Sequence, residues 1–142
     1  MSKKIKSTTT SNPNYKIITI EKPDAIASEA YRRIKIGLEF ANVDNGVHVV
    51  QVTSAVQGEG KTIVALNLAA TYAEDNQKVL LVDLDLRRPK IHRAFKVQNK
   101  DGTGITDLLA GKVTKEEAIK HSEYGIDFIN RGTKTNYPTS LL

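Results

Sequence analysis

The sequence of 142 residues contains no cysteine, which excludes disulfide bonds and metal sites built from thiolates. It also has no apolar run near the roughly 20 residues that a membrane-spanning helix needs. Its basic N-terminus lacks the apolar segment of a secretory signal peptide. These absences fit a reducing compartment, and a cytoplasmic location is the simplest interpretation.

The length allows one domain, and the apolar and charged fractions of 39% and 26% are ordinary for a soluble globular protein. The charge is uneven. Residues 1–35 hold eight Lys and Arg against three Asp and Glu, whereas residues 36–142 hold thirteen of each sign. We therefore predict a basic arm over residues 1–23, which is either disordered or in contact with an anionic membrane or nucleic acid.

After the arm, the apolar pattern alternates between helical and extended segments. It predicts a helix over 24–41 that begins at Asp24, and a buried helix over 61–74. The helix over 24–41 should present one apolar stripe: Ala27, Ala30, Tyr31, Ile34, Leu38 and Ala41. Strands are expected at 47–53, 78–85 and 125–130, and short helices at 89–95, 104–111, 114–120 and from 138 onward. This order predicts an α/β fold with a mainly parallel sheet flanked by helices.

The stretch "AVQGEGKT", residues 55–62, follows the P-loop pattern G-x-x-x-x-G-K-[ST], with Ala55 in place of the first glycine. Backbone N–H groups of such a turn bind phosphate oxygens, and the following helix N-terminus adds positive potential. Glycines at 58 and 60 permit a positive φ and a close approach to the ligand. Lys61 should reach the β- and γ-phosphates, and Thr62 should bind Mg²⁺. We therefore predict an ATP site formed by Ala55, Gly58, Glu59, Gly60, Lys61 and Thr62.

The stretch "LLVDLDLRRP" places Asp83 and Asp85 at the carboxyl end of the predicted strand 78–85, where ligands bind in open α/β sheets. Residues two apart on an extended chain point to the same side. These two carboxylates are therefore candidates to hold a metal ion or to accept a proton from a nucleophile. Arg87 and Arg88 supply positive charge for phosphate or for the carboxylates.

The segments "TSAVQGEGKT", "LLVDLDLRRP", "IHRAF", "GITDLLAG" and "PTSLL" together resemble the bacterial tyrosine kinases of capsule and exopolysaccharide synthesis, the CpsD/CapB type. The resemblance covers most of residues 24–142 and implies a P-loop kinase domain there. It implies that Lys61, Asp83 and Asp85 are catalytic, that Thr62 and Asp83 bind Mg²⁺, and that Arg87 contributes to nucleotide binding. The implied reaction is transfer of the ATP γ-phosphoryl group to tyrosine.

The same resemblance extends to "EAYRRIK" in the predicted helix over 24–41. This stretch is similar to the family's oligomerisation motif E-x-x-R-x-x-R, with Glu29, Arg32 and Lys35 at its three positions. The implied partners are further copies in a homo-oligomeric ring, tyrosine-containing protein substrates and a membrane-embedded polysaccharide co-polymerase that activates the kinase. The implied location is therefore the inner face of the cell membrane, and no nucleic acid partner is expected.

Two features typical of the family do not occur in this sequence: the Walker B strand with its aspartate, and a tyrosine-rich tail. The resemblance therefore implies the front portion of such a kinase, with the C-terminal part of the fold missing and with impaired activity. Two alternatives remain. One is a partitioning or positioning ATPase of the ParA/MinD type, although that class usually has lysine where this chain has Val56. The other is a non-catalytic module that binds nucleotide or a partner.

Overall fold

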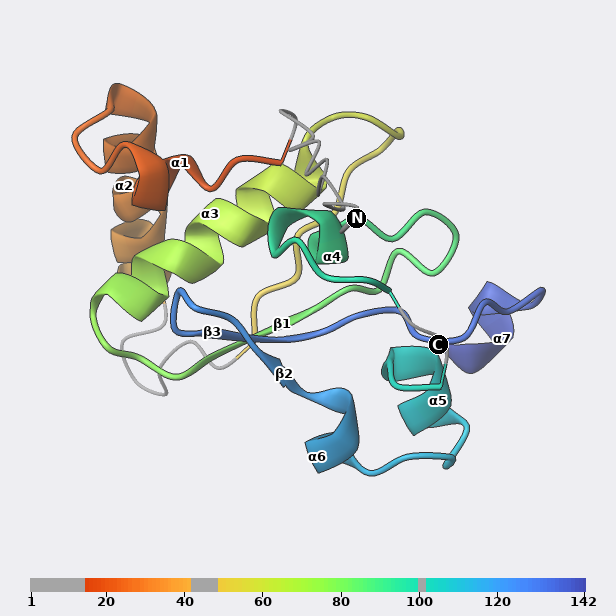
Figure 1. Ribbon diagram of the computed structural model, residues 1–142. Helices are drawn as coiled ribbons and strands as arrows, with labels where there is room; N and C mark the ends of the chain where they lie inside the picture. The colour runs from red at the N-terminus through yellow and green to blue at the C-terminus, as the bar shows by residue number, and fades with distance from the viewer. Residues whose placement is uncertain (1–14, 42–48, 100–101) are drawn as a thin grey trace, which may run out of the picture.

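The computed structural model describes residues 15–41, 49–99 and 102–142, which form a small sheet with helices on both faces (Figure 1). Strand β1 (Val79–Val82) runs parallel to β3 (Ile126–Ile129), and the short β2 (Lys120–His121) pairs antiparallel with β3. The strand order is β1-β3-β2. The predicted α/β fold with a mainly parallel sheet flanked by helices is confirmed.

The helices lie in two layers around the sheet (Figure 1). On one side are α1 (Ile18–Glu21), α3 (Lys61–Glu74) and α4 (Ile91–Ala94), with α2 (Ile26–Ala41) packed on α3. On the other side are α5 (Ile105–Leu109), α6 (Lys115–Ala118) and α7 (Pro138–Leu141). No helix within the described ranges is both long and apolar enough to cross a membrane.

The core is divided by the sheet because successive strand residues point to opposite faces. Val79, Leu81 and Ile126 pack against α1, α3 and α4, where Leu66 is fully buried. Val82 and Ile129 pack against α5 and α6 on the other face. The continuous apolar run of β1 therefore serves both layers, as expected for a strand of a parallel sheet.

Helix α3 matches the predicted boundaries 61–74, and its residues 66–71 are buried, as its apolar sequence predicts. Helix α6 begins with a capping box, in which Thr114 accepts a hydrogen bond from the Glu117 N–H and the Glu117 carboxylate accepts one from the Thr114 N–H. These two helices are therefore determined largely by local sequence.

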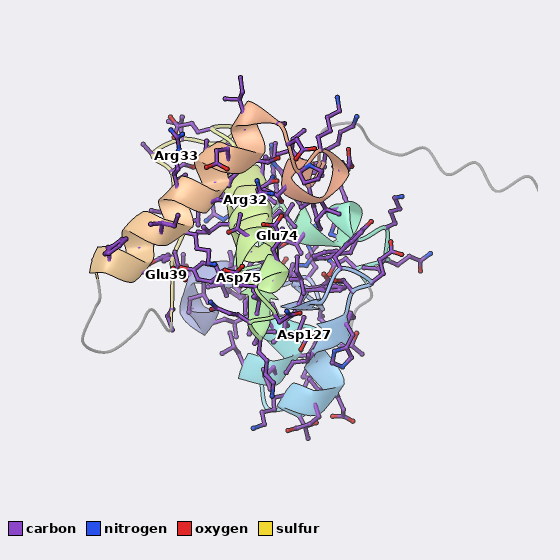
Figure 2. All side chains as sticks on the ribbon, turned by 90° about the vertical axis from the view of Figure 1, so that its left-hand side faces the viewer. Arg32, Arg33, Glu39, Glu74, Asp75 and Asp127 are labelled. Atoms are coloured by element: carbon purple, nitrogen blue, oxygen red, sulfur yellow. The ribbon has the colours of Figure 1, made fainter. Side chains whose placement is uncertain are left out.

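Helix α2 is attached to α3 by charged side chains, of which Arg32 and Glu74 are labelled in Figure 2, and only Tyr31 and Leu38 of the predicted apolar stripe are half-buried. Arg32 forms two hydrogen bonds with the Glu74 carboxylate, at 3.0 and 3.1 Å. Lys35 is buried and forms an ion pair with Asp75. Four residues of the predicted stripe are exposed: Ala27, Ala30, Ile34 and Ala41. The prediction was wrong for these four residues, because the acidic end of α3, some forty residues away, pairs with Arg32 and Lys35 on another face of α2.

Two other segments differ from the sequence-based expectation. Residues 49–53, the described part of the predicted strand 47–53, form no strand; Val50 and Val52 instead line a groove with α3 and β1. The end of the predicted arm is folded, since residues 15–23 include α1 and Ile17 is buried in the core. Residues 1–14 of the arm and the predicted turn at 42–46 lie outside the described residues.

A buried carboxylate joins α5 to the segment after β3. Asp107 accepts hydrogen bonds from the N–H groups of Gly104 and Thr133 and from the Thr133 hydroxyl. These hydrogen bonds hold the backbone of Gly132 against Gly104. A Cβ atom at Gly104 would lie 2.1 Å from the backbone nitrogen of Gly132. The absence of a side chain at Gly104 is therefore a requirement of this contact.

We expect Gly104→Ala to destabilise the fold by about 1–3 kcal/mol, the usual cost of overpacking, because the added methyl group meets backbone atoms. Gly37→Ala makes the same chemical change inside α2, where nothing lies within 4 Å of the added atom. It should leave stability unchanged or raise it by up to about 1 kcal/mol. Urea unfolding of both variants measures the difference, and equal midpoints would contradict the close contact.

Candidate nucleotide site

The predicted phosphate loop is an exposed turn that leads directly into α3. Gly58 and Gly60 have φ angles of +88° and +89°, in the region that favours glycine. Glu59 accepts a hydrogen bond from the Val56 N–H within the turn. No side chain caps the N-terminus of α3, so the first N–H groups of this 14-residue helix are available to an anion. The turn therefore has the backbone form that phosphate binding requires.

Lys61 lies at the first position of α3 and reaches across to the carboxyl end of β1. Its Nζ atom is 3.1 Å from Oδ2 of Asp85, and both side chains are partly exposed. Burial alone would raise the pKa of Asp85, but the N–H of Arg88 and the ammonium of Lys61 outweigh that effect and hold the pKa below its ordinary value. The predicted nucleotide lysine and one predicted catalytic carboxylate are thus in direct contact.

Asp83 is used differently from Asp85. It is 5% exposed; its Oδ1 accepts a hydrogen bond from the Asp85 N–H, and its Oδ2 accepts bonds from the N–H groups of Lys90 and Ile91. Burial raises the pKa of Asp83, and these three hydrogen bonds oppose the increase without cancelling it. Asp83 therefore holds the chain as it turns from β1 into α4.

The other predicted site residues lie around the Lys61–Asp85 pair, and their surroundings do not assign a role to them. Thr62 is half-buried beside Lys61, and Ala55 and Arg87 are exposed. The loop 55–62 fits a phosphate group, because Gly58 and Gly60 have positive φ angles and no side chain caps the N-terminus of α3. The two carboxylates are less well suited to bind Mg²⁺ as they stand. Asp83 already accepts backbone N–H groups, and Asp85 is already paired with Lys61.

The three residues predicted for oligomerisation lie together on α2. Glu29 is exposed and is 3.6 Å from Arg32. The contacts of Arg32 with Glu74 and of Lys35 with Asp75 are both within one chain (Figure 2). Hydrogen bonding to Glu74 raises the pKa of Arg32. Two of the three predicted interface residues are thus engaged inside the monomer.

Comparison with known proteins gives the family. A sequence model described as the AAA domain matches residues 47–131, which is more than half of the chain. The chain belongs to the AAA domain family. The matched region begins before the phosphate loop and ends after β3, so it contains Lys61, Asp83 and Asp85.

The relatives are tyrosine kinases. Tyrosine-protein kinase YwqD of Bacillus subtilis (strain 168) is 40% identical over 127 residues, which cover 89% of this chain and 53% of the relative. Tyrosine-protein kinase etk of Escherichia coli (strain K12) is 36% identical over 130 residues, covering 91% of this chain and 18% of the relative. The resemblance to bacterial tyrosine kinases of the capsule and exopolysaccharide type is confirmed.

A solved structure agrees with this assignment. The kinase domain of the Escherichia coli tyrosine kinase ETK has a TM-score of 0.82 and 36% identity, and the match covers 89% of this chain and 49% of that one. The chain therefore spans about half the length of this kinase domain and of the Bacillus relative.

Sequence reasoning missed three polar residues around the site. Lys90 donates its backbone N–H to Asp83, and its side chain and that of Arg93 lie over the ring of Tyr15. Asn130 follows β3 at the same edge of the sheet as Asp83, and within the described part of the chain neither amide atom of its buried side chain has a hydrogen-bond partner. No local sequence signal could have found the contacts of Lys90 and Arg93 with Tyr15, since they join segments more than seventy residues apart.

The contact between Asp85 and Lys61 predicts a pH dependence of stability. Because the pKa of Asp85 is lower in the folded state, its ionisation stabilises the fold above the ordinary aspartate pKa of about 3.9, and this stabilisation is lost as pH falls through the lower folded value. We expect Asp85→Asn to lower the free energy of unfolding by up to about 1 kcal/mol at pH 7, as expected for a partly exposed ion pair. The loss should shrink steadily in acid.

Urea unfolding between about pH 3 and pH 7 measures this difference. Asp24→Asn, at an exposed carboxylate outside the site, is the matched control and should show little change at any pH. A loss in Asp85→Asn that is the same at every pH would contradict the ion pair as its cause.

Proposed function

We propose that this chain is the ATP-binding part of a protein-tyrosine kinase that regulates capsular or exopolysaccharide synthesis. The observation that carries the proposal is the contact of Lys61 with Asp85, which joins the phosphate loop to the carboxyl end of β1. This contact brings the lysine of the phosphate loop and a candidate catalytic carboxylate to the same place. The names of the relatives support tyrosine as the acceptor.

In this proposal ATP binds with its phosphates on the loop 55–62. The backbone N–H groups at the start of α3 hold the phosphate oxygens, and Lys61 leaves Asp85 to contact the β- and γ-phosphates. Arg87, which is exposed, adds positive charge at the edge of the site. Such positioning and charge stabilisation make up most of what a protein contributes to phosphoryl transfer.

Release of Asp85 from Lys61 also gives the carboxylate a role. A free Asp85 is ionised at neutral pH, because an ordinary aspartate pKa is about 3.9 and the Arg88 N–H still favours the charged form. It can therefore orient an incoming tyrosine hydroxyl or receive its proton. Thr62 and Asp83 are the proposed Mg²⁺ ligands. To bind the ion, Asp83 would lose one of its hydrogen bonds from a backbone N–H group. When bound, Mg²⁺ would neutralise charge that develops on the transferred phosphoryl group.

The proposed partners follow from the kinase assignment. They are protein substrates with accessible tyrosines, a membrane-embedded polysaccharide co-polymerase whose cytoplasmic segment activates the kinase, and further copies that form a ring. The chain would then act in the cytoplasm, peripherally at the inner face of the membrane, and would not bind nucleic acid. These proposals concern the whole protein, since the match covers 53% of the Bacillus relative and 18% of the Escherichia coli relative.

We expect Lys61→Met to reduce phosphotyrosine formation by roughly 100-fold, because it removes a cation that contacts the transferred group. The assay is incubation of the chain with γ-labelled ATP and Mg²⁺, with and without the cytoplasmic segment of a co-polymerase. Lys78→Met is the matched control, since Lys78 is exposed at the opposite end of β1 and should leave the rate unchanged.

Two outcomes would contradict the proposal in different ways. ATP hydrolysis without phosphotyrosine, stimulated by DNA or membrane, would favour a positioning ATPase. Nucleotide binding without either product would favour a non-catalytic module.

The ring proposal gives a separate prediction on α2. Because Arg32 and Lys35 are paired with Glu74 and Asp75, replacing both acids by Glu74→Gln and Asp75→Asn should leave these cations only their longer contacts with Glu29 and Glu39. They could then pair with a neighbouring copy and increase self-association. Sedimentation velocity measures the change. Glu116→Gln, in an exposed pair on α6, is the control and should leave the distribution unaltered. A monomer of normal stability that does not associate would count against these residues as interface residues.

A further inference from the structure

Tyr15 has a defined place beside the candidate site. The segment that follows it is anchored: the carbonyl oxygen of Lys16 accepts a hydrogen bond from Asn67 of α3, and Ile17 is 4% exposed in the core. The Tyr15 side chain itself is half-exposed, so its ring is held on the surface without being buried.

Two cations lie over the Tyr15 ring. Lys90 Nζ and Arg93 Cζ are each 6.0 Å from the ring centroid. Within the described part of the chain neither cation forms a salt bridge with a carboxylate. A neutral tyrosine gives these two cations only a weak partner, of the cation–π kind. A phosphate on the same side chain would bring about −1.5 to −2 charges and three acceptor oxygens to them.

The other described tyrosines lack this arrangement. The Tyr72 hydroxyl is buried, and one cation, Lys35, lies over its ring. A hydrogen bond to Glu123 raises the pKa of Tyr124, so a phosphate there would face a carboxylate. Tyr31 is half-buried on α2 and Tyr137 is 74% exposed, and no cation of the described residues lies over either ring.

The position of Lys90 connects Tyr15 to the candidate site. Lys90 donates its backbone N–H to Asp83, and the charge of its side chain contributes to the low pKa of Asp85. An anion that binds the Lys90 side chain would therefore act on the loop that carries both site carboxylates. It would also fix the end of the basic N-terminal segment against α4.

We propose that Tyr15 is a phosphorylation site and that Lys90 and Arg93 bind its phosphate group. The source of the phosphoryl group rests on the proposed kinase function. In the transfer, the Tyr15 hydroxyl oxygen bonds to the γ-phosphorus of ATP, and the bond from that phosphorus to the β-phosphate oxygen breaks. ADP leaves with the electrons of that bond, and the phenolic proton passes to the Asp85 carboxylate and from there to solvent.

The first experiment tests phosphate binding and does not depend on kinase activity. Phosphotyrosine is incorporated at position 15 by genetic code expansion, and its second ionisation is followed by ³¹P NMR. We expect a lower pKa for the phosphate at position 15 than for one incorporated at position 137. The double substitution Lys90→Gln and Arg93→Gln should abolish that difference, and it keeps the Lys90 backbone N–H for Asp83. Equal titration at positions 15 and 137 would overturn the binding claim.

The second experiment tests Tyr15 as the acceptor. The chain is incubated with ATP and Mg²⁺, and phosphotyrosines are located by mass spectrometry in the wild type, in Tyr15→Phe and in Tyr137→Phe. We expect label at Tyr15 that Tyr15→Phe removes and Tyr137→Phe retains. Label confined to other tyrosines would overturn the acceptor claim. A complete absence of phosphotyrosine would instead contradict the proposed kinase function, and the NMR titration would still decide whether Lys90 and Arg93 bind the phosphate.

Discussion

The parallel pairing of β1 with β3 is the contact on which the rest of the described fold depends. Its register places Val82 beside Ile129, so both strands end together, and Asp83 continues the ladder through its N–H to the carbonyl oxygen of Ile129. Each face of the pair covers a separate apolar cluster. Without this pairing the two helical layers would share no common surface, and Asp83 and Asp85 would not face Lys61.

Burying a carboxylate at the end of such a strand costs desolvation free energy, which hydrogen bonds from backbone N–H groups must offset. Asp83 is almost fully buried, and its ionised form is stabilised by three N–H groups from residues that follow it. Losing one of these donors would leave the buried charge with fewer partners, so the loop from β1 to α4 is constrained in shape. That constraint also fixes the backbone of Lys90, and it explains how a residue outside the phosphate loop comes to lie between Tyr15 and the site.

The sequence predicted most of the helices and strands that local residues determine. Its predictions were wrong where the conformation depends on residues far away in the chain. The glycine turn before α3, α3 itself and two strands followed from pattern, although the strands at 79–82 and 126–129 are shorter than the predicted 78–85 and 125–130. Residues 49–53 have the β-branched composition of a strand, but extended segments become strands through pairing, and no described strand pairs with them. The buried face of α2 and the position of Tyr15 depend on Glu74, Asp75, Lys90 and Arg93, which no local window contains.

The Lys61–Asp85 pair can be exchanged for phosphate because it is only partly buried. Ion pairs with this degree of exposure contribute about 0–1 kcal/mol, since water screens the charges and the side chains lose freedom. A triphosphate offers Lys61 several negative charges, beside a helix N-terminus that no side chain caps. The exchange is therefore favourable, and it leaves Asp85 ionised without a partner beside the bound phosphates. In this way the same contact holds Lys61 in place before ATP binds and supplies a carboxylate afterwards.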